Sequence, residues 1–333
     1  MPPEPAGKDA CPTAPAVVSL SVYRFHPSAR FPYRPPMHWQ KISLIGVGLL
    51  GGSLGLALRR RQLATKVVGY VRREAGVQEC LQAGAVDHAT THLAEAVTDA
   101  DLVVFCTPLA QMRALAERLL PAVKRGAVVT DVGSVKASVV QDLEALFAGV
   151  GARFVGSHPM AGGEKMGVGA ARADLFENTL CLVTPTAASH AKSVTQIEEL
   201  WQSVGSRPLR MSPEMHDELV SRSSHLPHVV AAELANYVLS PIHPKQQAQL
   251  CAAGFRDTTR IAAGSPEMWR DIALANRKNL ARVLGVFIED LQEFQLALEN
   301  GDAKTIEEFF ANARQRREAW AANGASSAGT SPE

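Results

Sequence analysis

The chain has 333 residues, 46% of them hydrophobic, and its 34 lysines and arginines against 33 aspartates and glutamates give a net charge of +1. This balance offers no electrostatic basis for binding nucleic acid or an anionic membrane, so we expect a small-molecule substrate and a second copy of the chain as partners. The length allows two domains, and the five scattered cysteines indicate a cytoplasmic, reducing compartment with no disulfide framework and no metal site.

Residues 1–36 form a leader rich in proline, alanine and serine, with no apolar run long enough for a signal peptide or a membrane span. We expect the leader to be disordered. An organelle transit peptide is an alternative, although its prolines oppose the amphipathic helix that such peptides form. A second alternative is that translation begins at Met37.

The first predicted strand, residues 41–45, runs directly into a G-x-G-x-x-G motif and a helical segment over residues 53–59. In this context the first glycine makes a tight turn, the second lets the backbone approach a pyrophosphate, and the third lets the helix pack on the strand. The motif therefore predicts a dinucleotide site, whose contacts we expect at Gly46, Gly48, Leu49, Leu50 and Gly51.

The end of the second predicted strand, residues 66–70, should meet the adenosine ribose of the dinucleotide. Arg72 and Arg73 follow this strand, and two guanidiniums suit a 2′-phosphate better than a diol. We therefore expect NADP to be favoured over NAD. The alternative is that the arginines only begin a solvated helix and that Glu74 binds the ribose of NAD.

Two later strands also end in polar residues. The strand that begins at residue 101 ends at Thr107 and Pro108, which we include in the cofactor site, and the strand 127–131 leads to Ser134. Ligands of such sheets bind at the carboxyl ends of the strands, so one crevice can hold these residues. For Lys136 we favour the exposed first turn of the helix 137–147.

An apolar run then leads into residues 156–165, where small residues surround His158. An imidazole has an ordinary pKa near neutrality and is the usual group for moving a proton at pH 7. The alternative is a glycine- and proline-rich turn in which the histidine only caps a loop. A strand over residues 180–184, a helix near 197–204 and a strand over 208–211 complete the first domain.

From Ser212 onward the hydrophobic period is that of helices, and no further strand is predicted. The chain therefore divides into a nucleotide-binding domain (37–211), a helical domain (212–322) and a disordered tail (323–333). Residues 224–228 interrupt the first helix with a proline between two histidines, which predicts a kink with exposed backbone.

Residues 253–260 place two arginines around an aspartate, as in a carboxylate clamp or a solvated ion-pair face. The long predicted helix 280–298 has more apolar surface than one stripe requires. We expect it to pack both on its own domain and on a second subunit, and an ordinary core helix is the alternative.

Six of these motifs, in this order, resemble the prephenate/arogenate dehydrogenases of tyrosine biosynthesis. They are residues 46–51, 107–108, 131–136, 157–162, 224–228 and 254–260. The resemblance extends from about Lys41 to about Leu298. It implies an α/β Rossmann-like dinucleotide-binding domain followed by an all-α helical dimerisation domain. It also implies oxidative decarboxylation of prephenate to 4-hydroxyphenylpyruvate, or of arogenate to tyrosine, with hydride transfer to NAD(P)+.

The resemblance assigns roles to individual residues. His158 matches the catalytic histidine, which accepts a hydrogen bond from the 4-hydroxyl of the substrate. Ser134 matches the serine that helps to fix this hydroxyl and the histidine. Arg260 matches the arginine that binds a substrate carboxylate, and His228 matches a histidine of the substrate pocket.

Three further substrate-site positions follow from the resemblance: Asp257, Ser224 and Glu164. Asp257 would hold the arginine cluster in place, and Glu164 would gate the pocket electrostatically. The preference between prephenate and arogenate stays open, as does feedback by tyrosine.

Two other functions compete with this interpretation. The β-hydroxyacid and imine-reductase dehydrogenases also join a Rossmann domain to a helical one, and Lys278 could then serve as a catalytic lysine. A cofactor-sensing protein that binds NADP without turnover is the second alternative.

Overall fold

The computed structural model describes residues 38–163 and 165–328, with residues 323–328 as backbone only. The expectations for the leader and for Glu164 therefore lie outside the described residues. Within the described ranges, every helix is too short or too polar to cross a bilayer.

Six strands form a wholly parallel sheet in the order β3-β2-β1-β4-β5-β6, which is that of dinucleotide-binding folds and confirms the Rossmann-like domain. They are β1 (Trp39–Ile45), β2 (Ala64–Tyr70), β3 (His88–Thr90), β4 (Leu102–Phe105), β5 (Val128–Asp131) and β6 (Arg153–Phe154). The strand β3 did not emerge from the sequence, because three residues are too few to reveal an alternating pattern.

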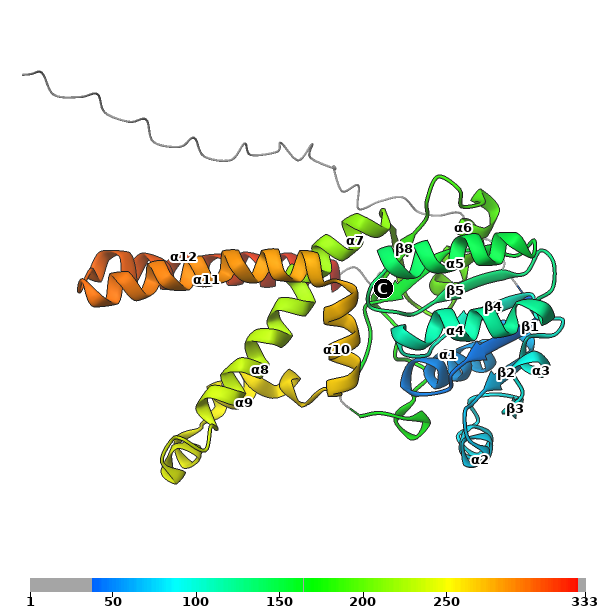
Figure 1. The fold of residues 1–333 in the computed structure, drawn as a ribbon, viewed down its shortest axis with the longest axis horizontal. Helices are drawn as coiled ribbons and strands as arrows, with labels where there is room; N and C mark the ends of the chain where they lie inside the picture. Colours follow the sequence, from blue (N-terminus) through cyan, green and yellow to red (C-terminus); the bar gives the residue numbers. More distant parts are fainter. Residues whose placement is uncertain (1–37, 164, 329–333) are drawn as a thin grey trace, which may run out of the picture. The chain divides into compact units, whose positions relative to one another are not determined.

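Helices cover both faces of this sheet, and Figure 1 shows α4 and α5 in front of the strands. The helices of this domain are α1 (Leu49–Arg60), α2 (Glu74–Gln82), α3 (Leu93–Val97), α4 (Leu109–Leu119), α5 (Ala137–Gly149) and α6 (Ala191–Ser203). α1 and α6 contribute to one buried cluster, and α3, α4 and α5 contribute to the other. A sheet with both faces buried explains why its strands read as continuous apolar runs.

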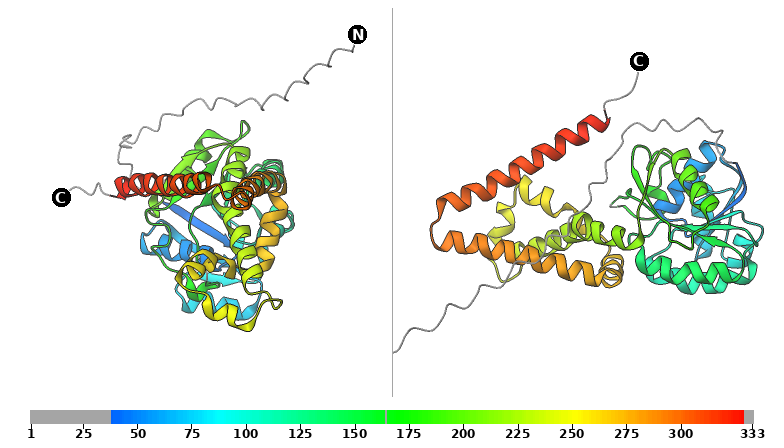
Figure 2. Two further views of the ribbon diagram at one scale, coloured as in Figure 1. Left: turned by 90° about the vertical axis from the view of Figure 1, so that its left-hand side faces the viewer. Right: turned by 90° about the horizontal axis from the view of Figure 1, so that it is seen from above.

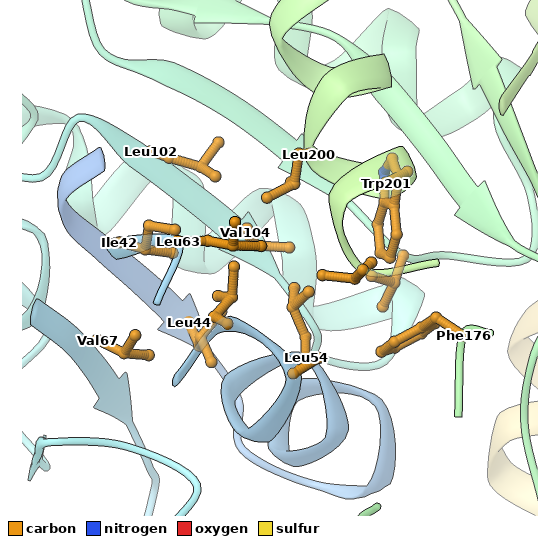
Figure 3. Close-up of a cluster of buried hydrophobic side chains, with 14 of the residues drawn as sticks. Ile42, Leu44, Leu54, Leu63, Val67, Leu102, Val104, Phe176, Leu200 and Trp201 are labelled. Carbon is orange, nitrogen blue, oxygen red and sulfur yellow. The ribbon is translucent and has the colours of Figure 1, made fainter. Parts of the chain in front are cut away.

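The first of these clusters fixes α1 and α6 against the strands (Figure 3). Leu54 of α1 and Trp201 of α6 are fully buried and pack in one cluster with Leu44 and Val104 of the sheet. Truncation of such a leucine to alanine lowers the free energy of unfolding by about 2–5 kcal/mol. The turn between β1 and α1 is thereby held rigidly at the edge of the sheet.

A second, three-stranded sheet follows, with β7 (Gly156–Pro159) antiparallel to β8 (Leu180–Thr184) and β8 parallel to β9 (Arg207–Arg210). Only Val155 separates β6 from β7, so the chain passes directly from one sheet to the other. The main-chain N–H of Ser157 consequently donates to the Asp131 carboxylate at the end of β5, at 3.1 Å. His158 thus lies beside the ends of the parallel strands.

The rest of the chain is helical. Ser212 caps the first helix, and its hydroxyl accepts the N–H of Met215 at 3.1 Å. The predicted kink takes the form of a π-helical turn at Ser221–His225, just before Pro227. The longer helices are α7 (Pro213–Val220), α8 (Leu226–Val238), α9 (Ala253–Thr259), α10 (Pro266–Ala275), α11 (Arg277–Glu299) and α12 (Ala303–Ala328). Short 3-10 turns lie at Leu120–Ala122, Val168–Ala170, Lys245–Leu250 and Arg260–Ala263.

A turn joins α11 to α12, and the two helices diverge from it (Figure 2). Gly301 has a φ of 62°, and the Asp302 carboxylate accepts the N–H of Thr305 at 3.1 Å, so these residues end one helix and cap the next. Phe294 and Phe309 pack near the turn, with ring centroids 4.4 Å apart. α12 continues beyond residue 322, where we expected the helical domain to end.

Candidate active site

The glycine motif forms a tight turn between β1 and α1. Gly46 has a φ of 96°, and a Cβ there would lie 2.8 Å from the Thr107 side chain. A Cβ at Gly51 would collide with the main-chain oxygen of Gly46, whereas a Cβ at Gly48 would have no atom within 4 Å. The first and third glycines therefore permit the turn and the packing of the helix, and the second leaves space for a ligand.

The start of α1 offers hydrogen-bond donors to that space. Leu49 and Leu50 form its first turn, where main-chain N–H groups have no partner within the helix and attract anions. Thr107 follows β4 at the same edge of the sheet, and its buried hydroxyl has no hydrogen-bond partner among the described residues. Pro108 then begins α4 as its N-cap. These groups fit the pyrophosphate and a neighbouring polar part of a dinucleotide.

The two arginines after β2 are exposed and follow Tyr70 at the edge of the sheet. In the described part of the chain, neither Arg72 nor Arg73 forms an ion pair. The Glu74 carboxylate accepts a hydrogen bond from the Thr91 hydroxyl at 2.6 Å. This geometry leaves two guanidiniums near the expected position of the ribose, while the acidic side chain has a protein partner.

Lys136 is fully buried, and our expectation of an exposed first turn was wrong. Its ammonium donates to the Asp131 carboxylate and to the main-chain oxygen of Ser157, the latter at 2.9 Å. Burial lowers the pKa of Lys136, and the negative charge of Asp131 opposes that effect. The expectation failed because the start of a helix is usually solvated, and nothing local shows that β7 covers this turn.

His158 lies on β7 and is 8% exposed. Its Nδ1 is 2.9 Å from Nε2 of His216, and among the described residues its Nε2 has no hydrogen-bond partner. Burial lowers the pKa of His158 well below its ordinary value, and His216, Lys136 and His225 lower it further. The imidazole is therefore neutral at pH 7 and can accept a hydrogen bond through Nε2.

His216 and Asp217, which the sequence analysis missed, lie behind this imidazole on α7. Nδ1 of His216 is 2.8 Å from Oδ1 of Asp217. The Asp217 carboxylate also accepts the N–H of Lys136 at 2.7 Å and that of Ala137 at 2.9 Å, at the start of α5. The signal that could have found them is a His-Asp pair in the first turns of an amphipathic helix, directly after a domain boundary.

Ser134 is half-buried after β5, and its main-chain carbonyl faces the imidazole of His225. Burial is the main cause that lowers the pKa of His225, to about 4. Nδ1 of His225 is 3.2 Å from Nδ2 of Asn276, which also donates to the main-chain oxygen of Asp217 at 2.8 Å. In the described part of the chain no hydrogen bond joins Ser134 to His158, so its expected role stays a prediction.

The histidine expected in the substrate pocket stacks on a tryptophan that we did not anticipate. The rings of His228 and Trp269 are 3.7 Å apart between centroids, at 28°. Nδ1 of His228 lies 2.9 Å from the main-chain oxygen of Ser224. Burial lowers the pKa of His228, the hydrogen bond to Ser224 opposes this effect, and the positive charge of Arg260 lowers the pKa further. Ser224, His228 and Arg260 therefore share one environment.

Contacts link this environment to His158. The ring of His225 lies 6.2 Å from that of Trp269, and Asn276 connects His225 to Asp217. The exposed Asp257 forms no ion pair with either neighbouring arginine within the described residues, so its expected role also stays a prediction. Lys278, the lysine of the alternative dehydrogenase class, is exposed on α11.

Two family models match consecutive stretches of the chain. The nucleotide-binding domain of prephenate dehydrogenase matches residues 54–209. The dimerization domain of prephenate dehydrogenase matches residues 212–312.

Known proteins are similar over most of the chain. Prephenate dehydrogenase of Bacillus subtilis is 33% identical over 280 residues, which is 83% of this chain and 75% of that protein. Cyclohexadienyl dehydrogenase of Zymomonas mobilis is 34% identical over 282 residues, which is 84% of this chain and 95% of that protein. The crystal structure of prephenate dehydrogenase from A. aeolicus, in complex with hydroxyphenyl propionate and NAD+, is similar with a TM-score of 0.79 and 32% sequence identity. The matched region is 84% of this chain and 98% of the A. aeolicus chain.

Proposed function

The chain belongs to the prephenate dehydrogenase family, and on that premise we propose that it oxidises and decarboxylates prephenate, or its amino analogue arogenate, with hydride transfer to NADP. The observation that carries this proposal is the buried position of His158. One of its ring nitrogens is bound by His216, and the other is available at the edge of the sheet where the glycine turn lies.

His158 acts on the hydroxyl of the substrate. It accepts a hydrogen bond from the 4-hydroxyl, and as the hydride leaves the ring carbon the proton moves toward Nε2. The bond to the ring carboxylate then breaks, its electron pair completes the aromatic ring, and the phenolic oxygen takes the proton back. Carbon dioxide and the aromatic product leave without net release of a proton. Aromatisation drives the step, so the protein mainly has to orient the substrate and polarise one hydroxyl.

Arg260 and His228 hold the substrate in this proposal. The guanidinium binds a carboxylate, for which its planar pair of donors is suited. His228 lies in the same environment and is fixed by its stacking on Trp269. Ser224, Asp257, Ser134 and Glu164 complete the proposed pocket.

A nicotinamide dinucleotide bound at the glycine turn supplies the hydride acceptor. The open space at Gly48, the free N–H groups of α1 and the unpartnered Thr107 hydroxyl support this position. Preference for NADP over NAD rests on Arg72 and Arg73, which are exposed near the expected ribose. The A. aeolicus structure contains NAD+, so the proposed preference for the 2′-phosphate of NADP depends on the arginines of this chain alone.

The proposed assembly is a homodimer formed by the helical domain. Several large apolar side chains are exposed along α11 and α12: Val286, Ile288, Leu291, Leu296, Leu298, Phe309, Phe310 and Trp320. A monomer rarely leaves a large contiguous apolar surface in water. Light scattering at micromolar concentration should give the mass of a dimer, and a fully active monomer would contradict the proposal.

The cytoplasm is the compartment that we propose. The four cysteines of the described residues, Cys80, Cys106, Cys181 and Cys251, are all free thiols. Free thiols in this number suit a reducing compartment.

Steady-state rates with prephenate and arogenate, each with NADP and NAD, test the function and both preferences. We expect reduced nicotinamide to form from at least one substrate, with a higher kcat/KM for NADP. Binding of NADP without turnover of either substrate would instead support a cofactor sensor.

A further inference from the structure

His158 and the two side chains behind it form a buried line that crosses from the nucleotide-binding domain into the helical domain. Nδ1 of His158 faces Nε2 of His216 at 2.9 Å, and Nδ1 of His216 faces Oδ1 of Asp217 at 2.8 Å. His216 is 0% exposed and Asp217 is 2% exposed. Three of the four ring nitrogens therefore have one defined partner each, and Nε2 of His158 has none among the described residues.

The carboxylate at the end of the line sets the direction of both hydrogen bonds. Asp217 already accepts the main-chain N–H groups of Lys136 and Ala137, as an ionised acceptor does. The Nδ1 of His216 must therefore carry a hydrogen and donate it to Asp217. A neutral imidazole has only one N–H, so the Nε2 of His216 is an acceptor, and the Nδ1 of His158 must be the donor to it.

We infer that Asp217 and His216 are positioning residues that hold His158 in its Nδ1–H tautomer, with the lone pair of Nε2 directed at the hydroxyl of the substrate. In the opposite tautomer Nε2 would carry the hydrogen and could not accept from that hydroxyl. This inference rests on the proposed function only for the identity of the hydroxyl, because the tautomer is a property of the protein without substrate.

The assignment requires both imidazoles to be neutral, and burial lowers the pKa of each. Burial is the largest cause that lowers the pKa of His216, and Lys136 lowers it further, whereas Asp217 and Asp131 act in the opposite direction. For His158, burial, His216, Lys136 and His225 all act to lower the pKa. The buried ammonium of Lys136 thus disfavours a second positive charge on either ring.

The arrangement also has a geometric consequence. His158 lies on β7, whereas His216 and Asp217 lie on α7, after the end of the nucleotide-binding domain. The proton position on the histidine is therefore set by a residue from the other part of the chain. If His216 and Asp217 had only a structural role, their side chains would fill the same space but would leave the tautomer of His158 undetermined.

Nitrogen NMR of protein labelled with 15N-histidine tests the inference, because a protonated and an unprotonated ring nitrogen have different chemical shifts. The signal of His158 is assigned by its loss in His158→Asn. We expect the Nδ1–H tautomer for both His158 and His216 in the resting enzyme at pH 7. An Nε2–H tautomer, or a charged imidazolium, at His158 would overturn the inference even if every His216 variant fails to fold.

Variants at His216 then test the consequence for turnover. His216→Phe fills the space without an acceptor, and we expect kcat to fall roughly 10- to 100-fold with KM for the substrate little changed, because a buried N–H loses its partner. His216→Gln retains an acceptor oxygen and should retain most of the turnover and the Nδ1–H signal of His158. His38→Phe, at an exposed histidine far along the chain, is the control for the substitution itself.

The outcomes distinguish the positioning role of His216 and Asp217 from the proposed function. A folded His216→Phe with unchanged kcat, or His216→Gln as impaired as His216→Phe, would overturn the role of these positioning residues in turnover. If the wild type oxidises neither substrate, the proposed function fails, while the NMR measurement still decides the tautomer.

Discussion

Replacement of Lys136 by methionine tests the buried ion pair that lies under β7. Both side chains of the pair are 0% exposed, and methionine fills much of the volume of lysine without its charge. The Asp131 carboxylate would then remain buried with only the N–H groups of Gly133 and Ser157 as donors, at 2.8 and 3.1 Å. Removal of one partner from a buried pair lowers the free energy of unfolding by about 3–5 kcal/mol. Because two donors remain, we expect Lys136→Met to lower it by about 3 kcal/mol, which is a large part of the about 5–15 kcal/mol of a typical protein.

Urea unfolding without ligand measures this loss. Lys136→Met combined with Asp131→Asn removes the unpaired charge, so the double variant should be more stable than Lys136→Met by about 1 kcal/mol or more. Lys192→Met, at an exposed lysine of α6, is the matched control and should stay within about 0.5 kcal/mol of wild type. A loss below about 1 kcal/mol for Lys136→Met would refute the reasoning, since it would mean that the charge of Asp131 is solvated without its partner.

Four further predictions concern catalysis and binding. His158→Asn should lower kcat by roughly two to four decades with KM little changed, as measured by steady-state kinetics. The kcat/KM of wild type should fall only at pH values well below 6.5, because the lowered pKa keeps His158 neutral above that range and protonation below it removes the acceptor. Arg260→Ala should raise KM for the substrate roughly 10- to 100-fold with a smaller change in kcat, because a carboxylate clamp acts in ground and transition states alike. Arg72→Ala should lower kcat/KM for NADP by roughly one to two decades and leave NAD little affected, as measured with both cofactors.

Each of these expectations has a clear contrary result. Turnover of His158→Asn near that of wild type, or an acid limb that persists in this variant, would remove the imidazole from the mechanism. A fall in kcat without a rise in KM would show that Arg260 is not a ground-state clamp. Equal use of NADP by wild type and Arg72→Ala would leave the cofactor preference without its proposed cause.

The features that the sequence predicted well depend on local chemistry. The glycine motif of residues 46–51 predicted a turn because glycine is needed where φ is positive, as at Gly46, and where a Cβ would collide with a residue close in the chain, as at Gly51 with the Gly46 oxygen. Likewise Ser212 and Gly301 marked helix ends through capping chemistry that acts within a few residues.

The features that the sequence did not predict depend on partners far along the chain. Lys136 looked like a solvated helix start, because its burial comes from β7 and α7 rather than from its neighbours in sequence. His216 and Asp217 matter because α7 places them behind His158, 58 residues earlier in the chain. Trp269 stacks on His228 only because α10 lies beside the first helices of the domain.

The stoichiometry of the reaction tests the central proposal most directly. Prephenate labelled with 13C in its ring carboxylate, incubated with wild type and NADP, allows labelled carbon dioxide and reduced cofactor to be measured in the same sample. We predict equal amounts of labelled carbon dioxide, reduced cofactor and 4-hydroxyphenylpyruvate, with all three strongly reduced in His158→Asn. If arogenate is the preferred substrate, the same equality should hold with tyrosine as the product. Reduced cofactor without labelled carbon dioxide, or no reduced cofactor from either substrate, would contradict the account.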